Sequence, residues 1–267
     1  MSVNRTNMYD VEPHVAEIYD QQEDYTEDVE LIRRLIGERR ELRILEPFCG
    51  TGRILIPLAR DGHALVGLDR AKPMLDRART KVEQLPEDVQ SRIILLQSDV
   101  TEDEWPGDFD LVLLGGNCFY ELASPEEQEG CIASAAAALR TGGYVYVDND
   151  HMEGELDKSW RRPGAGRSFP TGTCADGARM ESSTETIWFD AERRLWRARR
   201  RTKVTFVDGR TFEREWVQQK HPCSTGEVRG WLEGHGFVVE HLFGDRDGNQ
   251  YSETSGRAIF WACKEGH

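Results

Sequence analysis

The sequence predicts an α/β fold that carries an inserted antiparallel β region. Between residues 42 and 148, apolar runs rich in Ile, Leu and Val alternate with polar segments of helix length. This alternation is typical of β-α units around a parallel sheet that is buried on both faces. After residue 150 the segments become more polar and rich in Thr, Trp, Phe and Val, and the pair Asp208-Gly209 is typical of a hairpin turn. We therefore expect a small antiparallel β meander inserted into a parallel sheet.

Five strands and one clear helix start are expected in the first half of the chain. The strands are predicted at 42–46, 64–69, 92–97, 110–114 and 144–148. Ser124 is followed by Pro125 and Glu127, a capping-box pattern that predicts a helix from this point to about residue 140. The carboxyl ends of parallel strands meet at one edge of the sheet, and ligands of such folds bind at that edge.

The second half is expected to leave the α/β pattern and then return to it. The meander strands are predicted at 179–189, 194–207 and 211–220. The Gly, Pro and Ser content of 160–173 is typical of a mobile loop. A second capping box, Ser224 with Glu227, predicts a helix that ends at Gly236. Two further strands, at 237–243 and 257–263, are expected to close the sheet.

Composition limits the classes of protein to which the chain can belong. A formal net charge of −14 repels phosphate backbones, so we expect no nucleic-acid partner. The sequence has no apolar run of the roughly 18 residues that a membrane helix needs, and its N-terminus lacks the apolar core of a signal peptide. We expect a cytoplasmic protein that does not bind membranes. The six cysteines form no C-x-x-C pair, and none has a histidine at ligand spacing, so we expect no metal site.

A glycine turn directly follows the first predicted strand. The segment EPFCGTGR, residues 46–53, lies between that strand and a helix. Gly50 and Gly52 allow a tight turn and a close approach of the backbone to a ligand, and Thr51 adds a hydroxyl group. A glycine turn alone has a structural explanation as readily as a functional one.

Acidic residues stand at the ends of the next two strands. Asp69 ends the second strand, where an acid in nucleotide-binding sheets accepts hydrogen bonds from the ribose hydroxyls. Asp99 follows the third strand, where it can accept from an adenine amino group while Val100 donates from its backbone. Each acid alone could cap a helix or be solvated. Their joint placement with the glycine turn favours a bound nucleoside.

These motifs resemble those of the class I methyltransferases that use S-adenosyl-L-methionine (SAM). Glu46 with the glycine turn resembles the first motif of that superfamily, Asp69 the second, Asp99 the third, and residues 115–118 the motif after strand four. The resemblance covers about residues 14–150, and the closing strands are similar to the end of many small-molecule members. It implies a Rossmann-like seven-stranded sheet that ends in an antiparallel hairpin, with SAM bound across the strand ends.

The resemblance also implies which residues contact SAM. Glu46 is placed to accept hydrogen bonds from the methionine ammonium, a group that NAD lacks, and the turn lacks the third glycine of dinucleotide-binding proteins. Tyr25 belongs to an N-terminal segment that resembles the lid of the family. The expected SAM contacts are Tyr25, Glu46, Gly50, Thr51, Gly52, Arg53, Asp69, Arg70, Met74, Asp99, Val100 and Gly115.

Within the superfamily, segments 114–122 and 147–156 resemble glycine N-methyltransferase and related amine methyltransferases. That likeness predicts that Asn117 contacts the acceptor amine. Tyr120 could hydrogen-bond the nucleophile, or it could be only a wall residue. His151 is the best candidate for a general base by residue type, with a surface or capping role as the alternative. The arginine that holds a free amino acid is missing after strand five, so the acid-rich segment there favours a cationic acceptor.

We divide the chain into a helical N-terminal lid (1–40), a SAM-binding α/β domain (41–151 and 221–267) and an inserted β region (152–220). The strand ends are occupied by SAM, so we expect the inserted region to cover the acceptor and set specificity. The predicted activity is methylation of a small-molecule substrate, most simply an amine. The alternatives are O- or C-methylation of a small metabolite, an NAD-dependent oxidoreductase and a non-catalytic SAM-binding protein.

A basic stripe in the inserted region has two interpretations. At strand period, residues 195–206 place Arg197, Arg199, Arg201 and Lys203 on one face. This face could bind a phosphorylated or carboxylated substrate. A solvated face paired with acids such as Glu213 is the more common arrangement.

Overall fold

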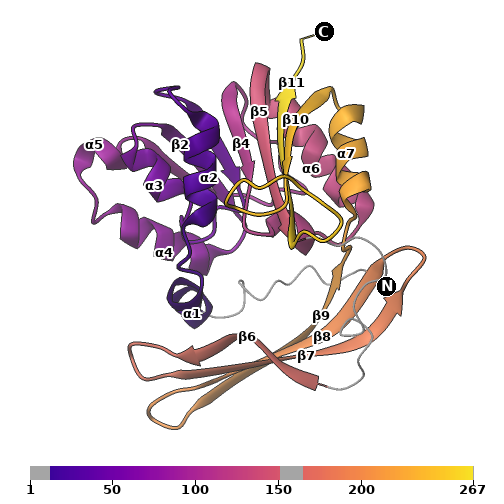
Figure 1. Cartoon of the computed structure of the whole chain (residues 1–267). Coiled ribbons are helices and arrows are strands. Elements are labelled where there is room, and N and C mark those ends of the chain that lie inside the picture. The colour runs from indigo at the N-terminus through magenta and orange to yellow at the C-terminus, as the bar shows by residue number, and fades with distance from the viewer. Residues whose placement is uncertain (1–12, 151–164, 267) are drawn as a thin grey trace.

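The computed structural model describes residues 13–150 and 165–266 of the chain. Two sheets are present (Figure 1). The helices are α1 (His14–Gln22), α2 (Glu27–Ile36), α3 (Leu55–Arg60), α4 (Lys72–Val82), α5 (Glu87–Gln90), α6 (Pro125–Ala138), α7 (Thr225–Gly234) and the short 3₁₀ helix η2 (Cys118–Glu121). The strands are β1 (Arg43–Pro47), β2 (Ala64–Asp69), β3 (Ile93–Gln97), β4 (Phe109–Leu114), β5 (Leu139–Asp150), β6 (Ala165–Thr173), β7 (Arg179–Asp190), β8 (Leu195–Thr205), β9 (Thr211–Lys220), β10 (Phe237–Phe243) and β11 (Arg257–Lys264).

The larger sheet has seven strands in the order β10-β11-β5-β4-β1-β2-β3. Strands β1 to β5 pair in parallel, whereas β11 runs antiparallel to both β5 and β10. This is the seven-stranded sheet with a closing antiparallel hairpin that the sequence predicts. The direction of the strand order reverses between β1 and β4, and ligands of doubly wound sheets bind at such a point.

Alternate residues of the central strands point into two separate apolar cores. Leu45 and Val112 belong to the core beneath α6 and α7, and Ile44 and Leu111 belong to the core beneath α2 and α3. Successive side chains of a strand face opposite sides of its sheet, so the continuous apolar runs in the sequence bury both faces. Figure 1 shows the two sets of helices on opposite sides of this sheet.

Both capping predictions hold at the first turn of their helices. At α7 the Ser224 hydroxyl accepts from the Glu227 backbone, and the Glu227 carboxylate accepts in return from the Ser224 backbone. At α6 the Ser124 hydroxyl accepts from the Glu127 backbone, but the Glu127 carboxylate accepts from the Ala123 backbone. Helix α6 ends at Ala138, slightly before the expected end, and β5 begins at the next residue.

The inserted region forms the smaller sheet, of four antiparallel strands in the order β6-β7-β8-β9. It lies across the strand-end edge of the larger sheet, with α1 between them (Figure 1). The prediction of a mobile loop over 160–173 is wrong for residues 165–173, which form β6; residues 160–164 lie outside the described residues. Gly172 has a packing role, because a Cβ there would lie 2.7 Å from the Ile18 side chain of α1.

Candidate active site

A cavity of about 560 Å³ lies at the strand-end edge of the larger sheet. One side is made by residues at the ends of β1 to β4, and we call it the strand-end wall: Glu46, Gly50, Asp69, Asp99 and Gly115 are its central members. A second part of the lining, which we call the roof wall, includes Glu121 of η2 and Gln218 and Gln219 of β9. Tyr19 of α1 also lines the cavity. The inserted sheet therefore contributes to the cavity through β9.

The turn after β1 is fixed by the acid at the end of β2. Gly50 and Gly52 have φ angles of +55° and +79°, in the left-handed region that glycine adopts without strain. The Asp69 carboxylate accepts hydrogen bonds from the backbone of Gly50 (2.8 Å) and of Ala71 (2.8 Å). Asp69 thus holds the glycine turn against its own strand while lining the cavity.

Asp99 is held in its ionised form at the end of β3. Its Oδ1 accepts from the backbone and hydroxyl of Thr101, at 3.1 and 2.7 Å, and Arg70 lies 3.4 Å from Oδ2. Burial alone would raise the pKa of Asp99, but these hydrogen bonds and the Arg70 charge together lower it. A negative hydrogen-bond acceptor is therefore available where the sequence predicts an adenine amino group.

Glu46 is a buried carboxyl group with an unused acceptor. Its Oε2 atom is buried and has no hydrogen-bond partner among the residues that the structure describes. Burial raises the pKa of Glu46 to about 8. A cationic donor in the cavity would satisfy this oxygen and favour its ionised form. The ammonium of a SAM methionine moiety is such a donor, so the residues present fit SAM.

Arg53 connects the strand-end wall to the N-terminal helices. It forms two hydrogen bonds to the fully buried Asp28, at 2.8 and 2.6 Å, and donates to the Tyr25 hydroxyl at 3.1 Å. Burial alone would lower the pKa of Arg53, but the Asp28 carboxylate raises it above its usual value. The Tyr25 ring lies 3.9 Å from the Arg53 guanidinium and 4.2 Å from that of Arg246. The Tyr25 ring therefore forms cation–π contacts with two arginines.

Two expected SAM contacts of the turn have neighbours in the adjoining helices instead of in the cavity. Thr51 and Gly52 are not among the residues that line the described cavity. The Thr51 hydroxyl donates to Asp20 of α1 at 2.6 Å, and a Cβ at Gly52 would lie 3.3 Å from Ile56. Tyr25, which contacts Arg53 and Arg246, is also not a lining residue of this cavity. The nine other expected contacts line it: Glu46, Gly50, Arg53, Asp69, Arg70, Met74, Asp99, Val100 and Gly115.

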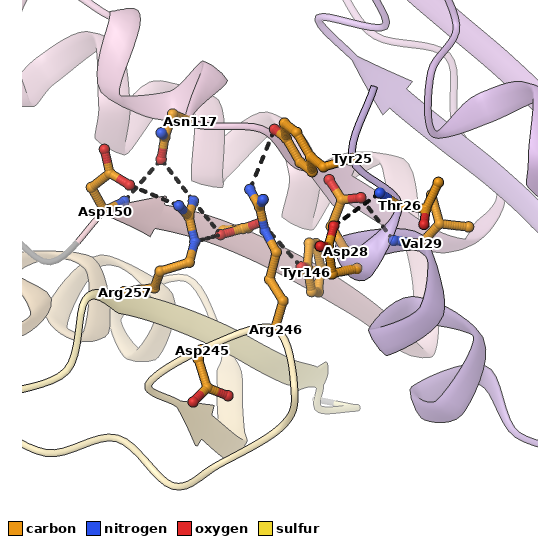
Figure 2. Close-up of polar contacts among 12 residues, drawn as sticks. Tyr25, Thr26, Asp28, Val29, Asn117, Tyr146, Asp150, Asp245, Arg246 and Arg257 are labelled. Atoms are coloured by element: carbon orange, nitrogen blue, oxygen red, sulfur yellow. Dashed lines mark hydrogen bonds and ion pairs between the residues drawn. The ribbon is translucent and has the colours of Figure 1, made fainter. Parts of the chain in front are cut away.

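An arginine and acid cluster at the end of β5 was not predicted from the sequence. Asp148 is fully buried and accepts from Arg246 (3.0 Å) and from Arg257 (2.6 Å). Arg257 also bonds Asp150 at 2.7 Å. Figure 2 shows both arginines reaching from the β10-β11 side toward β5, with Tyr25 beside Arg246. The sequence predicts that this acid-rich segment faces a cationic acceptor. Up to residue 150, its two aspartates are instead paired with arginines of the protein.

This cluster also forms hydrogen bonds with Asn117, which is one of the three predicted catalytic residues. The Asn117 side-chain oxygen accepts from the Asp150 backbone at 2.8 Å and from Arg257 at 2.9 Å (Figure 2). Asn117 does not line the described cavity. His151 lies outside the described residues. Gly115, Gly116 and Cys118 of this segment do line the cavity, and a Cβ at Gly115 would lie 2.7 Å from Ile54.

The roof wall contains a buried ion pair that joins η2 to β9. The Glu121 carboxylate accepts from Lys220, which is buried, and from the Gln218 amide at 2.8 Å. Burial would raise the pKa of Glu121, but the Lys220 ammonium outweighs it and the pKa is lowered. Tyr120 lies beneath Lys220, with the ammonium 4.6 Å from the ring centre, and burial raises the Tyr120 pKa. Like Asn117, Tyr120 is not a lining residue of the described cavity.

Three residues with metal-binding side chains meet at the junction of α1 and the inserted sheet. The ligand atoms of His14, Cys174 and Asp176 lie within 4.8 Å of one another. The His14 ring and the Asp176 carboxylate are hydrogen-bonded at 3.0 Å. Spacing along the sequence could not reveal this group, because α1 and the β6-β7 turn are far apart in the chain. The hydrogen bond between His14 and Asp176 links α1 to the inserted sheet.

Comparison with known proteins identifies the family. Residues 44–143 match the family model described as a methyltransferase domain. YqeM of Bacillus subtilis (strain 168), a protein named as a methyltransferase, is 33% identical over 83% of this chain and 84% of its own length. The chain belongs to the class I SAM-dependent methyltransferases. Its cofactor is SAM.

Two other similar proteins are an N-terminal methyltransferase and a sugar N-methyltransferase. The cypemycin N-terminal methyltransferase of a Streptomyces species is 26% identical over 79% of each chain. The solved structure of the sugar N-methyltransferase KedS8 from Streptoalloteichus sp. ATCC 53650 superposes with a TM-score of 0.71, covering 100% of this chain and 99% of that one at 19% identity. The likeness to KedS8 extends through the inserted sheet, so it concerns the fold of the whole methyltransferase. None of the helices in the described parts of the chain is long and apolar enough to cross a membrane.

Proposed function

We propose that this methyltransferase transfers a methyl group from SAM to the nitrogen of a small-molecule amine. The observation that carries the proposal is Glu121, a carboxylate that lines the cavity outside the SAM motifs and whose pKa is lowered. An ionised acceptor in this place attracts an ammonium group or the N–H of an amine. The similarity to an N-terminal methyltransferase and to the sugar N-methyltransferase KedS8 is in keeping with this.

In this proposal the residues of the chain bind and align the reactants. SAM supplies an activated methyl group, and displacement at that carbon depends chiefly on alignment with the attacking atom. Asp69 and Asp99 hold the nucleoside, and Glu46 holds the ammonium of the methionine moiety. Glu121 orients the amine. A carboxylate with a lowered pKa is a weak base, so Glu121 positions the amine and does not remove its proton.

In this proposal Asn117 has a structural role, and His151 keeps the role that the sequence predicts. Asn117 holds the end of β5 through its bonds to Asp150 and Arg257. His151, the next residue along the chain, remains a candidate to take the proton that the amine must lose before it attacks.

A methyl-transfer assay tests the proposal. The protein is incubated with SAM labelled in its methyl group and with matched sets of amines, alcohols and carbon acids that share a ring, and the products are identified by mass spectrometry. We expect label in the amine products. Labelled ethers or C-methyl products without any labelled amine would contradict the proposal.

A further inference from the structure

Two adjacent glutamines of β9 line the cavity, and their side-chain amides differ in how they are bonded. The Gln219 amide donates to the Ala123 carbonyl at 2.7 Å, and its oxygen accepts from Arg197 at 2.7 Å. The Gln218 amide donates to the Glu121 carboxylate at 2.8 Å. Its oxygen Oε1 is buried and has no hydrogen-bond partner in the part of the chain that the structure describes. Gln218 is 7% exposed, so an otherwise enclosed side chain brings an unused acceptor to the cavity.

The bond to Glu121 fixes which end of the Gln218 amide is unused. Glu121 is ionised, because the Lys220 ammonium outweighs burial and lowers its pKa. An ionised carboxylate only accepts hydrogen bonds, so the Gln218 nitrogen must face it and the oxygen must be the unused atom. A buried acceptor without a donor destabilises a fold, and proteins contain few of them. A donor on a ligand in the cavity would satisfy Oε1.

The unused oxygen lies beside the carboxylate that orients the amine in the proposed function. It is bonded to the same carbon as the nitrogen that donates to Glu121, so the carboxylate and Oε1 are neighbouring acceptors within one hydrogen-bonded unit. Two N–H groups on one nitrogen are the simplest donors for two neighbouring acceptors. A neutral primary amine has two N–H groups, a secondary amine has one, and a tertiary amine has none.

We propose that Glu121 and Gln218 together bind the two N–H groups of a primary amine, so that the enzyme adds one methyl group and stops at the secondary amine. The inference rests on the proposed function, in which Glu121 orients the nitrogen. The nitrogen lone pair forms the new N–C bond while the S–C bond of SAM breaks and its electron pair stays on sulfur. The products are S-adenosylhomocysteine and a secondary ammonium that keeps both N–H protons.

Both hydrogen bonds favour the first methyl transfer over a second one. The nitrogen becomes positively charged as it attacks, so its N–H groups become stronger donors to Glu121 and Gln218. Interactions that strengthen in the transition state accelerate the reaction. A secondary amine carries a methyl group in place of one N–H. It would therefore leave one of the two acceptors without a donor in a second transfer.

Two pairs of amines test this inference. Cyclohexylamine and benzylamine are each compared with their N-methyl derivatives, kcat/KM with SAM is measured for all four, and mass spectrometry counts the methyl groups added when SAM is in excess. We expect kcat/KM to be roughly tenfold or more higher for each primary amine, the effect of leaving one buried acceptor unpaired. The primary amines should gain a single methyl group.

Variants of the two glutamines provide the internal control, and thermal unfolding shows whether each variant is folded. Gln218→Met keeps the length of the side chain and removes Oε1, so it should reduce the preference for primary amines roughly tenfold and allow dimethylated products. Gln219→Met replaces an amide that is already bonded at both ends and should leave the preference unchanged, whatever its effect on the individual rates.

The outcomes separate this inference from the proposed function. Equal kcat/KM for primary and N-methyl amines with the unmodified protein, or an unchanged preference in Gln218→Met, overturns the inference while N-methylation itself stands. Labelled ethers or C-methyl products from the matched alcohols and carbon acids, with no methylation of any amine, would refute the proposed function and this inference with it.

Discussion

The two walls of the cavity are assembled over very different distances along the chain. On the strand-end wall, Asp69 bonds backbone groups 19 and 2 residues away. On the roof wall, Glu121 bonds Gln218 and Lys220, which are 97 and 99 residues away. The strand-end wall is therefore built by local motifs that a sequence displays, whereas the roof wall depends on how a separate sheet is placed.

The same contrast extends to electrostatics. Glu46 on the strand-end wall lacks a partner for one oxygen within the described residues, and its pKa is raised to about 8. Glu121 on the roof wall has a lysine and an amide as partners, and its pKa is lowered. The first acid is prepared to ionise when a cation binds, and the second is already ionised.

Removal of the roof-wall charges should have the largest effect. Glu121→Gln alone would leave the buried Lys220 ammonium without its partner, so the double variant Glu121→Gln with Lys220→Met removes both charges and protects the fold. We expect kcat/KM for an amine acceptor to fall roughly 10- to 100-fold, the loss of one charge-assisted hydrogen bond. SAM affinity, measured by calorimetry, should be unchanged. A parallel loss of SAM affinity would show that the two walls do not act separately.

Neutralising Glu46 should change the proton balance of SAM binding. With a pKa of about 8, Glu46 is mostly protonated at pH 7, and pairing with an ammonium favours its ionised form. SAM binding should therefore release nearly one proton from Glu46 at pH 7, and less as the pH rises above 8. Calorimetry in buffers of different ionisation enthalpy measures this release. Glu46→Gln should abolish that contribution, and an identical release by this variant would contradict the assignment.

The outer face of the inserted sheet should be the least sensitive region. Arg199 and Arg201 lie there in ion pairs with Glu185 and Glu215, so the basic stripe is the solvated, paired face that the sequence favoured over a substrate site. Arg201→Ser should change the free energy of unfolding by no more than about 0.5 kcal/mol. Kinetic constants for SAM and acceptor should be unchanged, and a marked rise in acceptor KM would restore the substrate-site interpretation.

The sequence predicts the parts of the molecule that rest on short-range patterns. The central strands appear as apolar runs, both capping-box patterns lie at helix starts, and Asp69 and Asp99 are found at strand ends beside the glycine turn. Strand β6 was missed because its Gly and Pro content resembles a loop, although Gly172 serves close packing against α1.

The residues that were missed or misplaced take part in long-range pairs. Asp148 and Arg257 lie 109 residues apart, and their pairing places Asn117 beside them and away from the cavity. Glu121 lies one residue after Tyr120, which the sequence predicts as a catalytic residue. Both belong to a 3₁₀ turn, in which neighbouring side chains point in different directions, and only Glu121 of the two lines the cavity. A pattern within one segment does not contain this information.

Calorimetric titration of SAM into the unmodified protein and into Asp69→Asn tests the central claim most directly. Asp69→Asn keeps the size of the side chain and one oxygen, which limits disturbance of the glycine turn. We predict one SAM per chain at micromolar affinity, and a loss of about 1.5–3 kcal/mol in the variant for each charged hydrogen bond to the ribose that is removed. Equal affinity of the two proteins, or no binding of SAM to either, would contradict the assignment of the strand-end wall as the SAM site.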